Sequence, residues 1–268
     1  MAIENVIEMN HVSKIYGGKT ENQVYALNDV SFTMQKGEFI GIMGASGSGK
    51  TTLLNTVSTL DHPTEGTVAI AGTDITRMKA RELSDFRAQR LGFIFQEFNL
   101  LDNLTVYENV ALPLSLQDMP VHQIMDRVGK VLDQLGIAEL ADKYPATISG
   151  GQRQRTAAAR AIVHEPALLL GDEPTGSLDT KNAVGLLEQM KRLNEQQQIS
   201  ILMVTHDAFS ASYCSRILFI QDGRLVQELY RLGSREAFYK QILNVLGDYG
   251  AAAAEAAAKE ISADADRG

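Results

Sequence analysis

Short apolar runs of strand length recur along the chain, separated by turns and by amphipathic stretches. Within residues 24–34, apolar Val30, Phe32 and Met34 alternate with polar residues, which is the two-residue period of a half-buried strand. Other runs are apolar throughout, as in strands that are covered on both faces. The strands that this pattern predicts cover residues 7–15, 24–34, 39–43, 67–71, 91–95, 167–170, 199–204 and 216–220.

The pattern becomes helical between residues 105 and 162. Thr105 and Glu108 have the spacing of a capping box, in which each side chain accepts a hydrogen bond from the other residue's backbone amide. Farther along, apolar residues recur every three or four positions until Gly136, a residue type that commonly ends helices. The predicted apolar face consists of Val121, Ile124, Met125, Val128, Val131, Leu132 and Leu135.

Helical stretches separate the last three strand-like runs, and this alternation predicts a parallel α/β sheet. Asp222 and Gly223 predict a hairpin turn after the last of these runs. Residues 234–246 have the pattern of an amphipathic helix, whereas the Ala-rich tail from residue 250 has the composition of a helical spacer. The predicted apolar side of that helix carries Phe238, Ile242, Leu243 and Leu246.

Composition and charge limit the classes of function. Of the 268 residues 44% are hydrophobic, which is enough for a full core, and the net charge of −8 argues against nucleic acid as the main partner. The single cysteine, Cys214, permits no intramolecular disulfide, which suits a reducing compartment. Glu4 and Glu8 argue against a signal peptide, and no apolar run approaches the roughly 18 residues of a membrane span. We therefore expect a soluble chain that can still dock on a membrane protein.

The strongest chemical signal follows the apolar run at residues 39–43. The next eight residues, Gly44 to Thr51, fit the pattern G-x-x-x-x-G-K-[ST] of a phosphate-binding loop. Glycines let backbone amides approach a phosphate, Lys50 reaches the β- and γ-phosphates, and the Thr51 hydroxyl can ligate Mg²⁺. The alternative, a flexible Gly/Ser loop, does not explain a strand, this motif and a helix in that order. The predicted phosphate-binding residues are Gly44, Ala45, Ser46, Gly47, Ser48, Gly49, Lys50, Thr51 and Thr52.

Two acids end the apolar run at residues 167–170. Asp172, at the carboxyl edge of a predicted strand, is placed to hold Mg²⁺, usually through water. Glu173 is suited to be the general base for an attacking water. The alternative is a solvated acidic loop after a buried strand, and the phosphate loop in the same chain favours the functional interpretation.

A second anion site is predicted at residues 148–152, Ile-Ser-Gly-Gly-Gln, which precede an Ala-rich helical stretch. Ser149 alone predicts only an N-cap. Two glycines at a helix start also offer unpaired backbone amides at the positive end of the helix dipole. One chain with two phosphate-type sites needs an explanation.

These motifs identify a resemblance to the nucleotide-binding subunits of ABC transporters. Residues 148–152 match the family signature Leu-Ser-Gly-Gly-Gln except that Ile148 replaces Leu, and the resemblance extends from about residue 9 to residue 232. It implies an α/β fold, a P-loop NTPase core with a mixed sheet, an N-terminal antiparallel β subdomain and an inserted helical subdomain. The expected boundaries are 1–232 for the nucleotide-binding domain, about 97–162 for the helical subdomain, 233–249 for a C-terminal amphipathic helix and 250–268 for an Ala-rich polar tail.

The resemblance also implies ATP and Mg²⁺ as cofactors and a role for each matching residue. Tyr16 would stack on adenine, Asp179 would face a partner subunit, and His206 would contact the γ-phosphate. Tyr16, Gln96 and His206 each have a purely structural alternative. Ser149, Gly150, Gly151 and Gln152 would bind the ATP of a second copy in a head-to-tail dimer, which explains the two phosphate-type sites. The implied catalytic residues are Lys50, Gln96, Glu173 and His206, and the implied metal ligands are Thr51, Gln96 and Asp172.

Longer stretches narrow the resemblance to one branch of the family. Residues 44–54 and 91–114 resemble the branch of lipoprotein-release, macrolide-efflux and antimicrobial-peptide-resistance ATPases, and residues 204–223 look most like its bacitracin- and lantibiotic-type members. This implies an ATPase motor for an FtsX-like permease at the cytoplasmic face of the membrane. Lipoprotein release and macrolide efflux are the alternatives within the branch. A soluble ABC ATPase of DNA repair or translation is disfavoured by the single cassette, and a P-loop kinase or G protein by the signature.

Phe98, Leu100 and Leu101 follow Gln96 in an expected surface loop. Apolar side chains in such a loop either pack on the core or bind a partner. The resemblance favours the partner, because a short permease helix docks at this place in the family.

Overall fold

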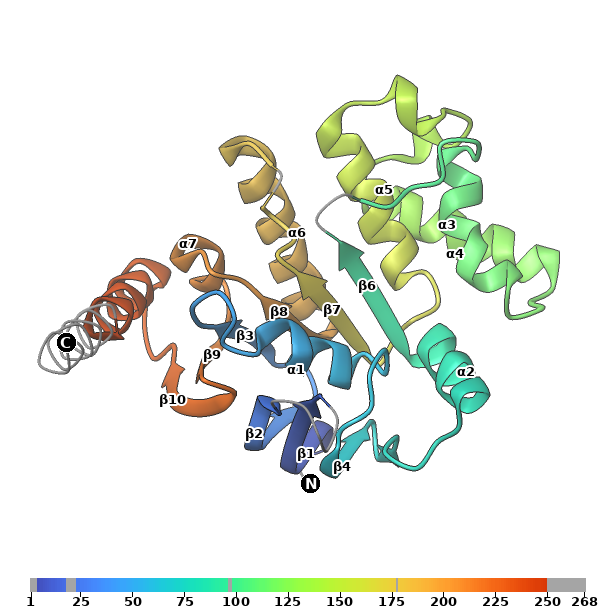
Figure 1. Ribbon diagram of the computed structural model, residues 1–268. Coiled ribbons are helices and arrows are strands. Elements are labelled where there is room, and N and C mark those ends of the chain that lie inside the picture. The colour runs from blue at the N-terminus through green and yellow to red at the C-terminus, as the bar shows by residue number, and fades with distance from the viewer. Residues whose placement is uncertain (1–3, 18–22, 96–97, 177, 250–268) are drawn as a thin grey trace, which may run out of the picture.

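The fold contains two sheets, described by a computed structural model for residues 4–17, 23–95, 98–176 and 178–249 (Figure 1). An antiparallel sheet has the order β2-β1-β4-β5, and a larger sheet has the order β10-β9-β3-β8-β7-β6. In the larger sheet only β10 runs antiparallel to its neighbour. The strands are β1 (Asn5–Tyr16), β2 (Val24–Gln35), β3 (Phe39–Met43), β4 (Glu65–Ile70), β5 (Thr73–Asp74), β6 (Leu91–Phe95), β7 (Leu168–Asp172), β8 (Ser200–Val204), β9 (Arg216–Gln221) and β10 (Arg224–Tyr230).

The helices divide into a group beside β6 and others around the larger sheet (Figure 1). Helices α3, α4 and α5 form that group, which corresponds to the predicted helical insertion. A last helix covers residues 235–249, where the Arg235 guanidinium lies over the rings of Phe209 and Tyr213. The other helices are α1 (Lys50–Val57), α2 (Ala80–Arg90), α3 (Val106–Ser115), α4 (Val121–Gln134), η1 (Ala138–Leu140), η2 (Pro145–Thr147), α5 (Gly150–Ile162), α6 (Thr180–Gln197) and α7 (Ala208–Ala211).

The larger sheet is covered on both faces, as its continuous apolar runs predict. Successive residues of a strand point to opposite faces. In β3, Phe39 and Met43 therefore join the core that includes α3 to α6, whereas Ile40 and Ile42 join the core formed with α1 and the antiparallel sheet. This double covering confirms the predicted α/β fold and fixes the strand that feeds the phosphate loop.

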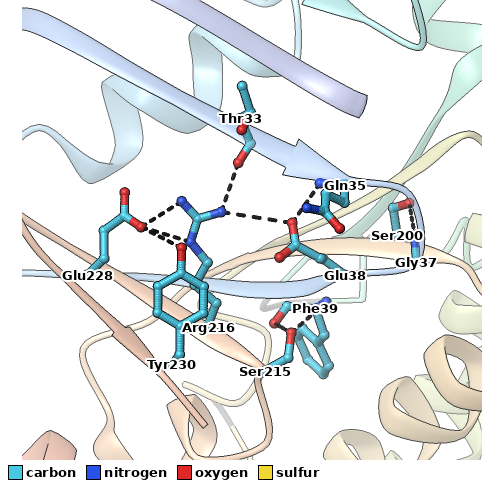
Figure 2. A network of polar contacts seen from close by, with 10 residues as sticks. All are labelled: Thr33, Gln35, Gly37, Glu38, Phe39, Ser200, Ser215, Arg216, Glu228 and Tyr230. Atoms are coloured by element: carbon cyan, nitrogen blue, oxygen red, sulfur yellow. Dashed lines mark hydrogen bonds and ion pairs between the residues drawn. The ribbon is translucent and has the colours of Figure 1, made fainter. Parts of the chain in front are cut away.

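A buried arginine ties the two sheets together at the end of β3 opposite the phosphate loop (Figure 2). The side chain of Arg216 is 8% exposed and donates two hydrogen bonds to Glu228 Oε2, at 3.1 and 2.8 Å. It also donates to the backbone oxygen of Thr33 at 2.9 Å, and its guanidinium lies over the Tyr230 ring. β9, β10 and β2 are thus joined through one guanidinium group.

Local predictions hold where a short pattern determines the backbone. The Glu108 amide donates to Thr105 Oγ1 and the Thr105 amide donates to Glu108 Oε2, which is the predicted capping box. Gly136 has a φ of 61° after α4, and Asp222 and Gly223 have φ values of 49° and 75° in the β9–β10 hairpin.

One helix was not predicted, and two predictions about apolar helix faces are wrong. Helix α2 is absent from the sequence pattern because it buries only Leu83 and Phe86 within an otherwise polar stretch. Val121 and Met125 are 72% and 60% exposed, since the buried face of α4 is narrower than predicted and consists of Ile124, Val128 and Leu132. Leu243 was placed on the apolar side of the last helix and is 44% exposed.

Candidate functional site

The loop between β3 and α1 packs closely against β2 and β9. A Cβ atom on Gly44 would collide with the Ile220 carbonyl oxygen, and one on Gly49 would collide with the Ala26 carbonyl oxygen. Gly49 also has a φ of 107°, a conformation that side chains with a Cβ rarely adopt. The spacing of glycines in the motif therefore matches a loop that β2 and β9 confine closely.

Lys50 brings a positive charge into this loop. Its side-chain Nζ donates to the backbone oxygens of Gly44 at 2.9 Å and Ala45 at 2.6 Å, and the residue is 7% exposed. Burial lowers the pKa of Lys50, against the opposing effects of the Glu173 and Asp172 carboxylates. An ammonium group, the first amides of α1 and the helix dipole together favour an anion at this position.

A hollow of about 380 Å³ lies beside the loop. The β9–β10 hairpin supports one side of it, since the Gly223 amide donates to the Ser48 backbone oxygen at 2.9 Å. Ser48 Oγ is buried and has no hydrogen-bond partner within the described part of the chain. The hollow is lined by Val24, Tyr25, Ala26, Gly47, Gly49, Lys50, Thr51, Thr52, Asp222 and Gly223.

The predicted acids lie at the carboxyl edge of the larger sheet. Asp172 ends β7 and pairs with Val204 at the end of β8. Burial raises the pKa of Asp172, the neighbouring Glu173 carboxylate raises it further, and Lys50 opposes both. A cation would relieve this unfavourable charge. The oxygens of Asp172 and Thr51 fit Mg²⁺, which prefers hard oxygen ligands and takes few of them from protein when phosphates are present.

Glu173 and His206 are brought together from the ends of two adjacent strands. The His206 Nδ1 atom lies 3.0 Å from Glu173 Oε1. Glu173 has a φ of 42°, an uncommon conformation for a residue other than glycine, and its amide donates to the Val204 backbone oxygen at 2.9 Å. Backbone strain of this kind often marks a functional position.

Tyr16 lies at the end of β1, near the start of α1. Burial raises the pKa of its phenol, the hydrogen bond to Asp61 adds to that effect, and the Thr52 side chain opposes it. Because Thr52 also lines the hollow beside the phosphate loop, the Tyr16 ring lies next to that hollow. This is a suitable place for a group attached to bound phosphates.

The signature residues lie at the start of α5, away from the phosphate loop. Ser149 is the N-cap, and it exchanges capping-box hydrogen bonds with Gln152. Among the described residues the amides of Gly150 and Gly151 have no recorded hydrogen-bond partner. Ser149 and Gly151 line a separate hollow of about 710 Å³, which shares no lining residue with the one beside Lys50.

Asp179 begins α6 close to the signature. Its carboxylate accepts from the Asn182 amide at 2.9 Å and from the Asn182 side chain at 2.7 Å. The backbone hydrogen bond from Asn182 lowers the pKa of Asp179. A Cβ atom on Gly151 would lie 2.8 Å from Asn182 Oδ1, so the start of α6 packs directly on the start of α5.

Comparisons with known proteins agree with this geometry. The family model described as "ABC transporter" matches residues 27–176. The chain belongs to the ABC transporter family. It is 48% identical over 246 residues to the bacitracin export ATP-binding protein BceA of Halalkalibacterium halodurans, covering 91% of this chain and 97% of that protein. It is 41% identical to the macrolide export ATP-binding/permease protein MacB of Aggregatibacter actinomycetemcomitans, over 84% of this chain and 34% of that protein.

A solved structure extends the comparison to the fold of this ABC transporter ATPase. The dimeric post-hydrolysis state of the ATP-binding cassette MJ0796, bound to ADP and Pi, has a TM-score of 0.74 and 37% identity, covering 85% of this chain and 100% of that one. The predicted cassette fold and the ATPase activity are thereby confirmed.

Part of the site of this ATPase was predictable from the sequence. Gln96, Glu97 and Ser177 fall outside the described residues, so the predictions for Gln96 stay predictions. The contributions of Tyr25, Asp222 and Gly223 to the hollow were missed. The Asp222–Gly223 sequence predicted a hairpin turn, but it did not predict that this turn lies beside the phosphate loop.

Proposed function

We propose that this ABC transporter ATPase powers resistance to antimicrobial peptides of the bacitracin type, by exporting them or extracting them from the membrane. The observation that carries the proposal is the relative BceA, which matches over almost the full length of both chains. The match to MacB supports macrolide efflux as a second candidate, but it covers only 34% of that protein.

Susceptibility measurements separate the two candidates. Deleting the gene for this chain should increase the sensitivity of its host to bacitracin-type peptides and leave macrolide sensitivity unchanged. A host that becomes sensitive to macrolides alone would favour the second candidate and overturn the first.

We further propose how the site binds and hydrolyses ATP. Residues 44–52 hold the phosphates, with Lys50 offsetting their charge, and Tyr16 stacks on the adenine. Thr51 and Asp172, together with Gln96, would hold Mg²⁺, which supplies charge neutralisation at the phosphates. Glu173 accepts the proton of the attacking water, and His206 contacts the γ-phosphate. The support is the convergence of Lys50, Asp172 and Glu173 around one loop, which their mutual effects on pKa reflect.

We propose that two copies pair head to tail, with each signature completing the other copy's ATP site. The support is the separation of the two hollows, because one chain does not bring its signature to its own phosphate loop. Asp179, next to the signature, would then face the second copy. The relative MJ0796 is dimeric in its ADP- and Pi-bound structure.

A mixing experiment tests this shared site. Gly150 has room for a side chain, since its nearest neighbours would lie 4.0 Å from a Cβ atom, whereas Gly151 has Asn182 Oδ1 at 2.8 Å. Gly150→Asp should therefore spare its own subunit and repel the phosphate of the other. Gly150→Asp and Lys50→Ala should each be inactive alone, and their mixture should recover part of the ATPase activity. Full turnover by Gly150→Asp alone would contradict the signature role, and Gly129→Asp, on open α4, is the matched control.

We propose that an FtsX-like permease holds the ATPase at the cytoplasmic face of the membrane. Among the described helices, none has both the length and the apolar character to cross a bilayer. A largely apolar groove of about 400 Å³ lies between α2, β6, α3 and α5, with Phe93, Phe95, Leu112 and Leu116 in its lining. An amphipathic permease helix suits such a groove.

We also propose a division of the chain into a nucleotide-binding domain at residues 1–232, with a helical subdomain at about 97–162, a C-terminal amphipathic helix at 233–249 and an Ala-rich polar tail at 250–268.

A further inference from the structure

Lys14, Tyr16 and Asp61 form a closed set of contacts beside the phosphate loop. Lys14 Nζ donates to Asp61 Oδ1 at 2.5 Å, and the Tyr16 hydroxyl donates to Asp61 Oδ2 at 2.7 Å. Lys14 Nζ also lies 5.0 Å from the centroid of the Tyr16 ring, within the range of a cation–π contact. Each pair of the three side chains is therefore in contact.

Asp61 is held from several directions. The His62 amide donates to its Oδ1 atom at 2.8 Å, and the Asp61 amide donates to the Asn55 backbone oxygen in α1 at 3.1 Å. Burial alone would raise the pKa of Asp61, but the hydrogen bonds from Lys14 and Tyr16 lower it below its usual value. The carboxylate is thus charged, and it fixes two side chains of β1 to the turn that follows α1.

This arrangement restricts the Tyr16 side chain, at a cost in conformational entropy. Tyr16 is 43% exposed, and a tyrosine so exposed would ordinarily move between rotamers. The Lys14 side chain, by contrast, is only 13% exposed although it carries a charge. A half-exposed ring held by a sheltered ion pair, next to the Thr52 end of the phosphate loop, is organised before any ligand arrives.

We propose that Lys14 and Asp61 are positioning residues that hold the Tyr16 ring in the orientation in which it stacks on the nucleobase of ATP. Lys14 covers one face of the ring, so the base stacks on the opposite face. Fixing the ring beforehand raises affinity because the entropy of ordering it is not lost on binding. This inference rests on the proposed stacking role of Tyr16 and extends it to two residues outside the sequence motifs.

Calorimetric titration with two ligands tests the proposal. ATP contains the base, whereas inorganic tripolyphosphate offers only the phosphates, and both are titrated with Mg²⁺. Asp61→Ala and Lys14→Met should each weaken ATP binding by roughly three- to tenfold, a fraction of the affinity that base stacking provides, and leave tripolyphosphate binding unchanged. Asp61→Asn, which keeps an acceptor for the Tyr16 hydroxyl, should recover part of the affinity. Equal weakening of both ligands would overturn the proposal.

Measurements in a Tyr16→Ala protein distinguish failure of the positioning role from failure of the proposed stacking role. In a Tyr16→Ala protein, Asp61→Ala should have no further effect on ATP affinity. If Tyr16→Ala leaves ATP affinity unchanged, the stacking role and the positioning role both fail. If Tyr16→Ala weakens ATP binding but the Lys14 and Asp61 variants do not, only the positioning role fails. It fails likewise if the effect of Asp61→Ala persists without the tyrosine ring.

Two controls exclude a loss of folding. Lys36→Ala removes another ion pair, the exposed contact with Glu4 at 3.1 Å beside the ends of β1 and β2, and should change neither affinity. Thermal melts of all variants without nucleotide show whether the chain is folded at the temperature of the titration.

Discussion

The His206 imidazole and the Glu173 carboxylate are in contact, with Nδ1 of the one 3.0 Å from Oε1 of the other. The His206 side chain is 66% exposed and the Glu173 side chain 31%, so both remain accessible to a ligand. The contact joins the ends of β8 and β7, next to Asp172. The proposed base and the proposed γ-phosphate contact therefore constrain each other before nucleotide binds.

Replacing the base should separate ATP binding from hydrolysis. Glu173→Gln keeps the size of the side chain and removes its basicity, so turnover should fall by about 10²- to 10⁴-fold while ATP affinity is retained. Dimers should then accumulate with ATP and Mg²⁺, and light scattering measures them. Persistent monomer with ATP demonstrably bound would count against Glu173 as the base.

The contact between the two residues predicts non-additive effects. His206→Ala should also lower turnover, because it removes both a γ-phosphate contact and the partner of Glu173. The double variant with Glu173→Gln should be little slower than Glu173→Gln alone, since residues that act as a unit are not additive. The measurement is a double-mutant cycle, with turnover numbers from the wild type, the two single variants and the double variant. Strictly multiplicative effects would show that the two side chains act independently.

Asp172 should make nucleotide-free protein less stable at neutral pH. Because its pKa is raised in the folded state, the protonated carboxyl contributes stability that is full below the unfolded value, about 3.9, and is lost as pH rises through the folded value. Asp172→Asn should therefore raise the free energy of unfolding at pH 7, with a gain that shrinks as the pH falls toward 4. Urea unfolding at several pH values measures this. A gain independent of pH would exclude the charge as its cause.

Arg216 should be a major contributor to stability, away from the nucleotide. Arg216→Ala leaves Glu228 and the Thr33 carbonyl without their buried partner, and should lower the free energy of unfolding by about 3 kcal/mol. Arg216→Lys keeps the charge but loses the forked geometry of the guanidinium group, so it should recover only part of the stability that Arg216→Ala loses. Lys36→Ala, at an exposed ion pair, should cost about 0.5 kcal/mol or less. Urea unfolding compares the three, and equal losses would contradict the network's role.

Phe98 should serve the membrane partner more than the fold. It is half-buried, has a φ of 58°, and its ring lies 5.8 Å from the Arg153 guanidinium. Aspartate tolerates that backbone conformation better than phenylalanine and would lie near a positive charge, so Phe98→Asp should stay folded and bind ATP. It should co-purify poorly with the permease and lose partner-dependent ATPase activity.

A pull-down from detergent extract, with a thermal melt of the free subunit, measures both effects of Phe98→Asp. Tyr144→Asp, a substitution at an exposed aromatic residue that does not line the groove, is the control. A normal pull-down removes Phe98 from the interface, and a large fall in the melting temperature assigns it to the core.

Features that depend on short segments could be predicted from the amino-acid sequence alone. The phosphate loop, the N-cap at Ser149, the capping box at Thr105 and the Asp222–Gly223 hairpin each depend on residues within a few positions of one another. Backbone conformation and the first-turn hydrogen bonds of a helix are local, so residue type and spacing suffice to predict them. The apolar runs also predicted a buried sheet, and with it the edge where Asp172 and Glu173 lie.

Contacts between distant segments became known only from the folded structure. The sequence has no local signal that β9 pairs with β3, that Gly223 supports Ser48, or that Asp61 reaches Lys14 and Tyr16 across 45 or more positions. The sequence pattern also placed Val121 and Met125 on the apolar face of α4, although both side chains lie outside the part of that face that is buried. The physical reason is common to all of these. Such contacts depend on how whole elements pack, and the packed surfaces are assembled from remote parts of the chain. A hydrophobic pattern that repeats every two to four residues does not predict them.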